Sequence, residues 1–124
     1  EFMITVCDEK ENVIAFGLSV PSLGPAFQKS GGRLTPGAIT KMIKILRKPD
    51  VIDLGLIAVL PEYQSFGINA IILRELILGM MRENISYCET NLNLENNTKV
   101  QAQWKFFPKE QHKKRRSYLK IISR

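Results

Sequence analysis

Residues 53–73, DLGLIAVLPEYQSFGINAIIL, decide the fold of this chain. An apolar strand comes first, then a turn that contains Pro61, Gln64 and Gly67, and then an apolar helix. The first N–H groups of a helix have no internal acceptor and carry the positive end of the helix dipole. A glycine in such a turn lets the backbone approach a bound group without a Cβ atom in the way. The stretch therefore predicts a phosphate-binding turn between a central strand and a helix.

This turn resembles the acyl-CoA signature of the GNAT superfamily of N-acyltransferases. In that superfamily an apolar strand and Val-x-Pro precede the pattern Gln/Arg-x-x-Gly-x-Gly/Ala. Here Val59-Leu60-Pro61 precede Gln64-Ser65-Phe66-Gly67-Ile68-Asn69. Asn69 departs from the pattern, which has glycine or alanine there, and is expected to narrow the space beside the phosphates. The alternative is an ordinary strand-to-helix turn of an α/β domain, because a short motif is only a hypothesis.

The resemblance implies where an acyl-CoA binds. The backbone of the central strand aligns the pantetheine arm, and a backbone N–H near Ile57 to Val59 points at the thioester carbonyl. The pyrophosphate meets the N–H groups of the turn and of the first helical residues. The cofactor-binding residues expected on this basis are Leu56, Ile57, Ala58, Val59, Gln64, Ser65, Phe66, Gly67, Ile68, Asn69 and Ala70.

Three residues outside the turn also match positions of the superfamily. Asp53, eleven positions before Gln64, matches the general base of some members. The alternative is an aspartate near the strand start that faces solvent or pairs with a lysine. The apolar neighbours of Asp53 would raise its pKa, as a base near neutral pH requires. Asn97 matches an asparagine that hydrogen-bonds the pantetheine arm, or it only caps a helix. Trp104 stands where members have a tyrosine that protonates the leaving thiolate, and an indole has only an N–H donor. Trp104 is therefore expected to pack against the CoA arm or the core.

Hydrophobic periodicity and turn residues predict the remaining elements. Strands are expected at residues 3–7, 13–20, 51–60, 87–92 and 116–122, helices at 35–48, 66–83 and 97–107, and a polar loop at 28–32. The expected fold is an α/β domain with a GNAT-type mixed central sheet flanked by helices. It would lack the superfamily's first strand and first two helices. Residues 1–2 are expected to be a cloning scar, and residues 3–124 a GNAT-like acyl-CoA-binding domain of a longer protein.

The helix predicted at residues 35–48 has two distinct faces. Ile39, Met42, Ile43 and Leu46 share one face, and basic residues occupy the other. Such a helix either lies on a membrane or packs over the sheet. Packing over the sheet is the favoured interpretation, so no membrane partner is expected. The sequence also contains no apolar run of 18 residues or more, which a transmembrane helix needs.

The net charge of +6 is concentrated near the end of the chain. Residues 99–124 hold nine of the 18 Lys and Arg residues and a single acid, Glu110. The run Lys113–Arg116 suits a polyanion, but a solvated tail or charged strand edge is favoured, so nucleic acid is not the expected partner. Cys7 and Cys88 are expected to be free thiols, with Cys88 as a packing residue. His112 is the only histidine, and no metal site is expected.

The sequence thus predicts a cytoplasmic N-acetyltransferase domain. It would bind acetyl-CoA, or another acyl-CoA, and transfer the acetyl group to an amine that the sequence does not define. Two alternatives stay open: a GNAT-like module that binds CoA or a protein without catalysis, and a basic fragment that binds nucleic acid. Missing upstream elements and Trp104 predict low or no activity of the isolated chain. The strand at residues 3–7 would lack a neighbour, which predicts a homo-oligomer or a missing N-terminal segment.

Overall fold

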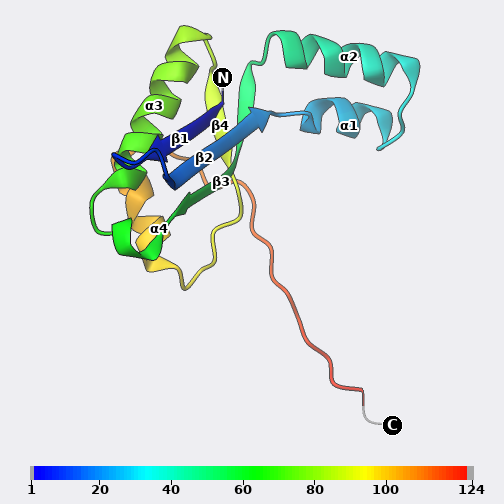
Figure 1. The fold of residues 1–124 in the computed structure, drawn as a ribbon. Helices are drawn as coiled ribbons and strands as arrows, with labels where there is room; N and C mark the ends of the chain where they lie inside the picture. The colour runs from blue at the N-terminus through cyan, green and yellow to red at the C-terminus, as the bar shows by residue number, and fades with distance from the viewer. Residues whose placement is uncertain (1, 123–124) are drawn as a thin grey trace. The chain divides into compact units, whose positions relative to one another are not determined.

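The computed structural model describes residues 2–122, which form two compact parts, one up to Asn91 and one from Leu92 (Figure 1). The first part holds a four-stranded sheet and three α-helices, and the second holds a short α-helix. No helix in residues 2–122 has the length and apolar character needed to cross a bilayer. The elements are β1 (Met3–Cys7), β2 (Val13–Pro21), α1 (Gly24–Ser30), α2 (Pro36–Arg47), β3 (Val51–Val59), η1 (Pro61–Tyr63), α3 (Ile68–Arg82), β4 (Tyr87–Thr90), α4 (Thr98–Gln103) and η2 (Trp104–Phe106).

The sheet has the order β1-β2-β3-β4 and is mixed. β1 pairs with β2, and β2 with β3, in antiparallel fashion, whereas β3 and β4 run parallel. The parallel pair is joined by α3, as a parallel connection requires a crossover helix. The predicted class, a mixed α/β sheet flanked by helices, is therefore confirmed.

The core lies between α3 and one face of the sheet. Ile68 and Ile72 of α3 are buried against Ile14 and Ala15 of β2. Gly17 of β2 lies under the same helix, and a Cβ atom built on it would come within 2.5 Å of Ile72 Cγ2. The close approach of α3 to the sheet therefore requires glycine at position 17.

Gly17→Ala is expected to lower the free energy of unfolding by about 1–3 kcal/mol, because the added methyl group overpacks the core. Ile72→Leu removes the clashing methyl branch and should restore part of the loss in the double variant. Gly37→Ala is the matched control, since a Cβ there meets no atom within 4 Å. Urea unfolding measures all four proteins. A Gly17→Ala variant as stable as the Gly37→Ala variant would contradict the packing described.

The opposite face of the sheet is apolar and largely uncovered. Phe16 and Leu18 of β2 are 36% and 38% exposed, and Leu56 of β3 is 53% exposed. β1 pairs only with β2 among the described residues, so its outer edge is open. Open edges and apolar faces favour association with another chain. The homo-oligomer expected from the sequence accordingly stays a prediction.

Two sequence predictions about secondary structure are wrong. Of residues 28–32, expected to be a polar loop, residues 28–30 belong to α1 and only Gly31 and Gly32 lie outside a helix. α1 begins at Gly24-Pro25 and ends before Gly31, which is in the left-handed region (φ 61°). Proline at the first turn suits a helix start, but seven residues are too few for a periodic signal. The strand expected at residues 116–122 is absent from the described part of the chain, where Leu119 is 92% exposed. A strand needs a paired neighbour, and alternation alone does not supply one.

The predicted helix at residues 35–48 is confirmed as α2, whose N-terminus is capped by Thr35 Oγ1 accepting from the Ala38 N–H at 3.2 Å. Its expected packing over the sheet is wrong. α2 packs against α1, and the two helices project beyond the sheet from the ends of β2 and β3 (Figure 1). An amphipathic pattern defines which face of a helix is apolar, but not which surface covers that face.

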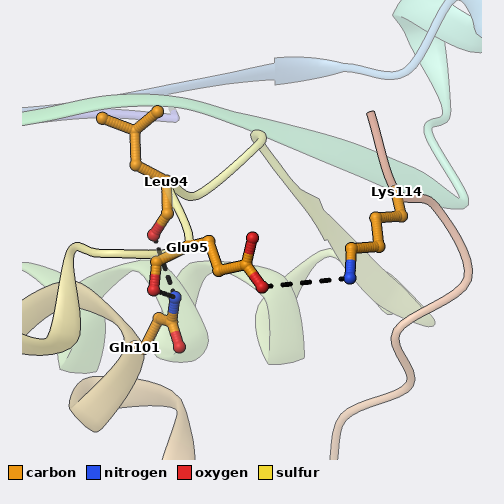
Figure 2. Close-up of polar contacts among 4 residues, drawn as sticks. All are labelled: Leu94, Glu95, Gln101 and Lys114. Atoms are coloured by element: carbon orange, nitrogen blue, oxygen red, sulfur yellow. Dashed lines mark hydrogen bonds and ion pairs between the residues drawn. The ribbon is translucent and has the colours of Figure 1, made fainter. Parts of the chain in front are cut away.

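The second compact part is organised around the start of α4. Gln101 Nε2 donates to the carbonyl oxygens of Leu94 at 2.9 Å and of Glu95 at 3.0 Å (Figure 2). Lys114 Nζ lies 3.9 Å from Glu95 Oε1, which is an exposed ion pair. The helix predicted at residues 97–107 is confirmed in outline, as α4 followed by the short η2 turn.

Candidate functional site

The two parallel strands separate part-way along the sheet. β4 pairs with β3 only from Val51 to Leu54, whereas β3 continues to Val59. Asn91 follows β4, and its Nδ2 donates to the Gly55 carbonyl oxygen at 2.5 Å. The strand expected at residues 87–92 therefore ends at Thr90. From Leu56 to Val59, past the Asn91–Gly55 contact, no strand within residues 2–91 pairs with the edge of β3 that faces β4. This edge of β3 is called the open edge.

The pairing with β2 shows which backbone groups face this open edge. The Leu60 N–H donates to the Ile14 carbonyl oxygen at 2.9 Å, so Leu60 faces β2. Backbone groups of an antiparallel strand alternate between its two sides. Ile57 and Val59 therefore direct their N–H and C=O groups to the open side. The Val59 carbonyl accepts from Gln64 Nε2 at 3.2 Å, and the N–H groups of Ile57 and Val59 have no acceptor among residues 2–122.

The turn between β3 and α3 presents further backbone donors. Gly67 is the N-cap of α3 with φ 73° and ψ 14°, and no side chain caps the helix. Three N–H groups of the turn bond to the chain, those of Gln64, Phe66 and Ala70. Four others have no acceptor within residues 2–122, namely those of Ser65, Gly67, Ile68 and Asn69. A cluster of free N–H groups at a helix N-terminus is a binding place for an anion.

The turn also has room for a bound group. A Cβ built on Gly67 would meet no atom within 4 Å, although the positive φ disfavours any side chain there. Phe66 is 73% exposed. The Asn69 side-chain oxygen is buried and has no donor within residues 2–122. It is thus turned inward, away from solvent, and the narrowing of the phosphate space expected at Asn69 stays a prediction. The donors and the open space together fit a phosphate group.

Comparison with solved structures identifies the fold. Aminoglycoside 6'-N-acetyltransferase AAC(6')-Ih from Acinetobacter baumannii matches with a TM-score of 0.57 over 98% of this chain and 70% of its own, at 16% identity. AAC(6')-Iy in complex with CoA matches with a TM-score of 0.58 over 97% of this chain and 75% of its own, at 14% identity. The chain has the GNAT fold.

A third structure supports the same fold from another source. An acetyltransferase from Trypanosoma brucei matches with a TM-score of 0.55 over 94% of this chain and 68% of its own, at 12% identity. No family model matches the sequence, and no curated protein matches it either. At these identities the comparisons establish the GNAT fold, and the chemistry has to be argued from the residues.

Asp53 lies on the sheet face opposite α3 of this GNAT domain. It is half-buried, and its neighbours Ile52 and Leu54 point their side chains toward the α3 side, where they are buried. In the sheet register Asp53 lies between Val20 of β2 and Glu89 of β4. Glu89 has no signal in the sequence, because only the β3–β4 register brings the two carboxylates side by side. Asn91 likewise has no signal in the sequence, because only the fold places it beside Gly55, where the two strands separate.

Cys88 of β4 is not a thiolate nucleophile. The pKa of the Cys88 thiol is raised to about 11, chiefly by burial; a backbone hydrogen bond at Leu54 lowers it in part, and the nearby carboxylates of Asp53 and Glu89 add to the increase. At neutral pH the group is therefore a protonated thiol. The other cysteine, Cys7, is exposed.

Iodoacetamide at pH 8 is expected to label Cys7 first and Cys88 at least roughly a hundredfold more slowly than an ordinary free thiol, because two pKa units remove that much thiolate. Mass spectrometry of timed samples measures both sites. A raised pKa in the folded protein also predicts that the contribution of Cys88 to stability is lost between about pH 9 and pH 11. Cys88→Ala should remove this pH-dependent loss of stability. Equal labelling rates at the two cysteines would contradict a half-buried, protonated Cys88.

Asn97 and Trp104 belong to the second compact part. Asn97 Oδ1 accepts from the Val100 N–H at 3.2 Å, so its side-chain oxygen is a helix cap. The Trp104 Nε1 atom is buried without a hydrogen-bond partner in residues 2–122, and its ring lies 6.1 Å from that of Phe107. The first part thus brings together Asp53, the open edge of β3 and the turn. The roles predicted for Asn97 and Trp104 at a cofactor stay predictions.

Proposed function

We propose that this chain binds acetyl-CoA, or another acyl-CoA, and transfers the acyl group to an amine. The observation that supports this most directly is the continuity of free backbone donors. They run from Ile57 and Val59 on the open edge of β3 to the four N–H groups of the turn at Gly67. An extended cofactor with a diphosphate at one end suits such a row of donors.

Each part of the row has its own role in the proposal. The four free N–H groups of the turn hold the diphosphate, and the absence of a Cβ at Gly67 leaves the necessary space. Ile57 and Val59 hold the pantetheine arm as an added strand would be held. A backbone N–H there polarises the thioester carbonyl, which is where negative charge develops during acyl transfer. When bound, acyl-CoA supplies the acyl group as an activated thioester.

Asp53 is the proposed general base. It lies on β3, four residues before Ile57 on the open edge, on the uncovered face of the sheet. Its role is to accept a proton from the attacking amine. Glu89 adds a second carboxylate on the same face, and two adjacent acids attract a positively charged amine. The proposed acceptor is accordingly a cationic amine.

A second candidate function is a module that binds CoA without catalysis. Trp104 favours it, because an indole N–H is not an acid that protonates a leaving thiolate. Asn97 is already engaged as a helix cap through its side-chain oxygen. An enzyme of this design would depend on solvent or on the acceptor to protonate the thiolate. Binding without turnover is the result that would favour the module.

Calorimetric titration with acetyl-CoA and with CoA tests the proposal. We expect saturable one-to-one binding of both, and competition experiments with longer acyl-CoA esters then define the preferred acyl group. Release of free thiol in the presence of small polyamines separates the enzyme from the module. No heat of binding with either compound, in a chain that circular dichroism shows to be folded, would contradict the proposed function.

A further inference from the structure

The helical hairpin formed by α1 and α2 has an unusual composition. Residues 22–49 contain six basic residues and no acidic residue. None of the six has an ion-pair partner within residues 2–122, and only one makes a side-chain hydrogen bond, Lys41 Nζ to the Pro25 carbonyl oxygen at 3.0 Å. The basic residues are Lys29, Arg33, Lys41, Lys44, Arg47 and Lys48.

The apolar face of α2 consists of two adjoining stripes. One stripe contains Ala38, which is 7% exposed, with Met42 and Ile45 half-buried, and it faces α1. The other stripe contains Ile39, Ile43 and Leu46, which follow the i, i+4, i+7 spacing of a single helix face. These three side chains are 46%, 46% and 55% exposed. The helix therefore leaves a continuous apolar strip uncovered even after it has packed against α1.

Basic residues border this exposed strip. Arg47 lies four residues after Ile43, and Lys44 lies three residues before Arg47, so the two basic side chains line one side of the strip. Leu34, immediately before α2, is 68% exposed and extends the apolar surface. An apolar strip beside unpaired basic side chains is the surface of a helix that lies in a membrane interface.

We propose that the α1–α2 hairpin docks peripherally on an anionic lipid surface. The Ile39, Ile43 and Leu46 side chains enter the interface, and the basic residues contact lipid phosphates and carboxylates. Charge complementarity favours an anionic lipid surface over a second copy of the chain, because a second copy would bring a hairpin of the same positive charge. A nucleic acid would pair with the basic residues, but would leave the aliphatic strip in water. The proposal is independent of acyl-CoA binding.

Co-sedimentation with vesicles tests this on the full chain. The vesicles are phosphatidylcholine alone, or phosphatidylcholine with phosphatidylserine. We expect binding to the mixed vesicles, weakening with added salt, and little binding to phosphatidylcholine alone. Lys44→Glu with Arg47→Glu should reduce partitioning roughly tenfold or more, because each basic residue near an anionic surface contributes measurably. Ile39→Ser with Ile43→Ser should reduce it by a similar factor through loss of apolar contact.

Matched controls carry the same chemical changes outside the hairpin. Lys10→Glu with Lys109→Glu removes the same charge from exposed positions elsewhere, and Met81→Ser removes an exposed apolar side chain of α3 (70% exposed). Both should retain most of the binding. Circular dichroism checks that every variant keeps its helices, and a variant that fails is replaced by the milder Lys44→Gln with Arg47→Gln or by Ile43→Ser alone.

Three results would overturn the proposal. Hairpin variants that bind the mixed vesicles as tightly as the wild type would show that the hairpin does not contact the membrane. Loss of binding only in the charge variant, together with competition by duplex DNA, would assign the surface to a polyanion. Dissociation of an oligomer by Ile39→Ser with Ile43→Ser in sedimentation without vesicles would assign it to a second copy.

Discussion

Gly67→Glu is expected to lower the affinity for CoA by at least roughly a hundredfold, because it places a carboxylate among N–H groups that bind a diphosphate. The side chain would enter the open space beside Gly67, where no atom lies within 4 Å. Like charges at that position repel the ligand, and the added bulk fills the place of its phosphates. Calorimetry with CoA measures the loss directly.

Gly31→Glu is the matched control for this change. Gly31 also has a positive φ, 61°, and a Cβ there also meets open space, but it ends α1 and lies outside the turn. The control therefore reproduces the backbone strain and the charge without touching the proposed site. We expect its CoA affinity to equal that of the wild type. A folded Gly67→Glu protein that binds CoA with wild-type affinity would contradict the assignment of the phosphate site.

Asp53→Asn is expected to lower kcat/KM for acetyl transfer by about 10²- to 10⁴-fold, since this is the usual contribution of a general base. The affinity for acetyl-CoA should stay unchanged, because the side chain lies on the face of β3 and not on its open edge. The assay follows release of the CoA thiol with a cationic amine as acceptor, across a range of pH.

Glu62→Gln serves as control for Asp53→Asn. Glu62 is an exposed carboxylate of η1, so its removal changes the same charge near the turn but not on the sheet face. We expect it to retain wild-type turnover. If Asp53→Asn retained full turnover at every pH while Glu62→Gln lost it, the base would have to be assigned elsewhere.

The elements with strong local signals were predictable from the sequence. The apolar run at residues 51–60 and the helix after Gly67 formed β3 and α3 almost as expected. Thr35-Pro36 marked the start of α2 because an N-cap side chain and a proline act within one turn of the helix. These features depend on residues adjacent in sequence, which explains why they needed no knowledge of the fold.

Features that depend on distant partners were not predictable in the same way. The alternating residues 116–122 have no neighbouring strand in the described chain, and α2 covers α1 with only one of its two apolar stripes. At the site, the motif located Gly67 and the turn. It did not show that Glu89 lies beside Asp53, or that Asn91 bonds Gly55 where the strands separate. Strand register decides both, and register is set by pairing across the sheet.

Amide chemical shifts followed by nuclear magnetic resonance during a titration with CoA test the central claim most directly. We expect the largest changes at the amides that lack acceptors in the described chain, those of Ser65, Gly67, Ile68 and Asn69. Smaller changes should follow at Ile57 and Val59. Amides of the β1–β2 turn, residues 8–12, should not move. If saturating CoA left the amide shifts of the Gly67 turn unchanged, or changed only shifts elsewhere in the chain, CoA binding at this turn would be contradicted.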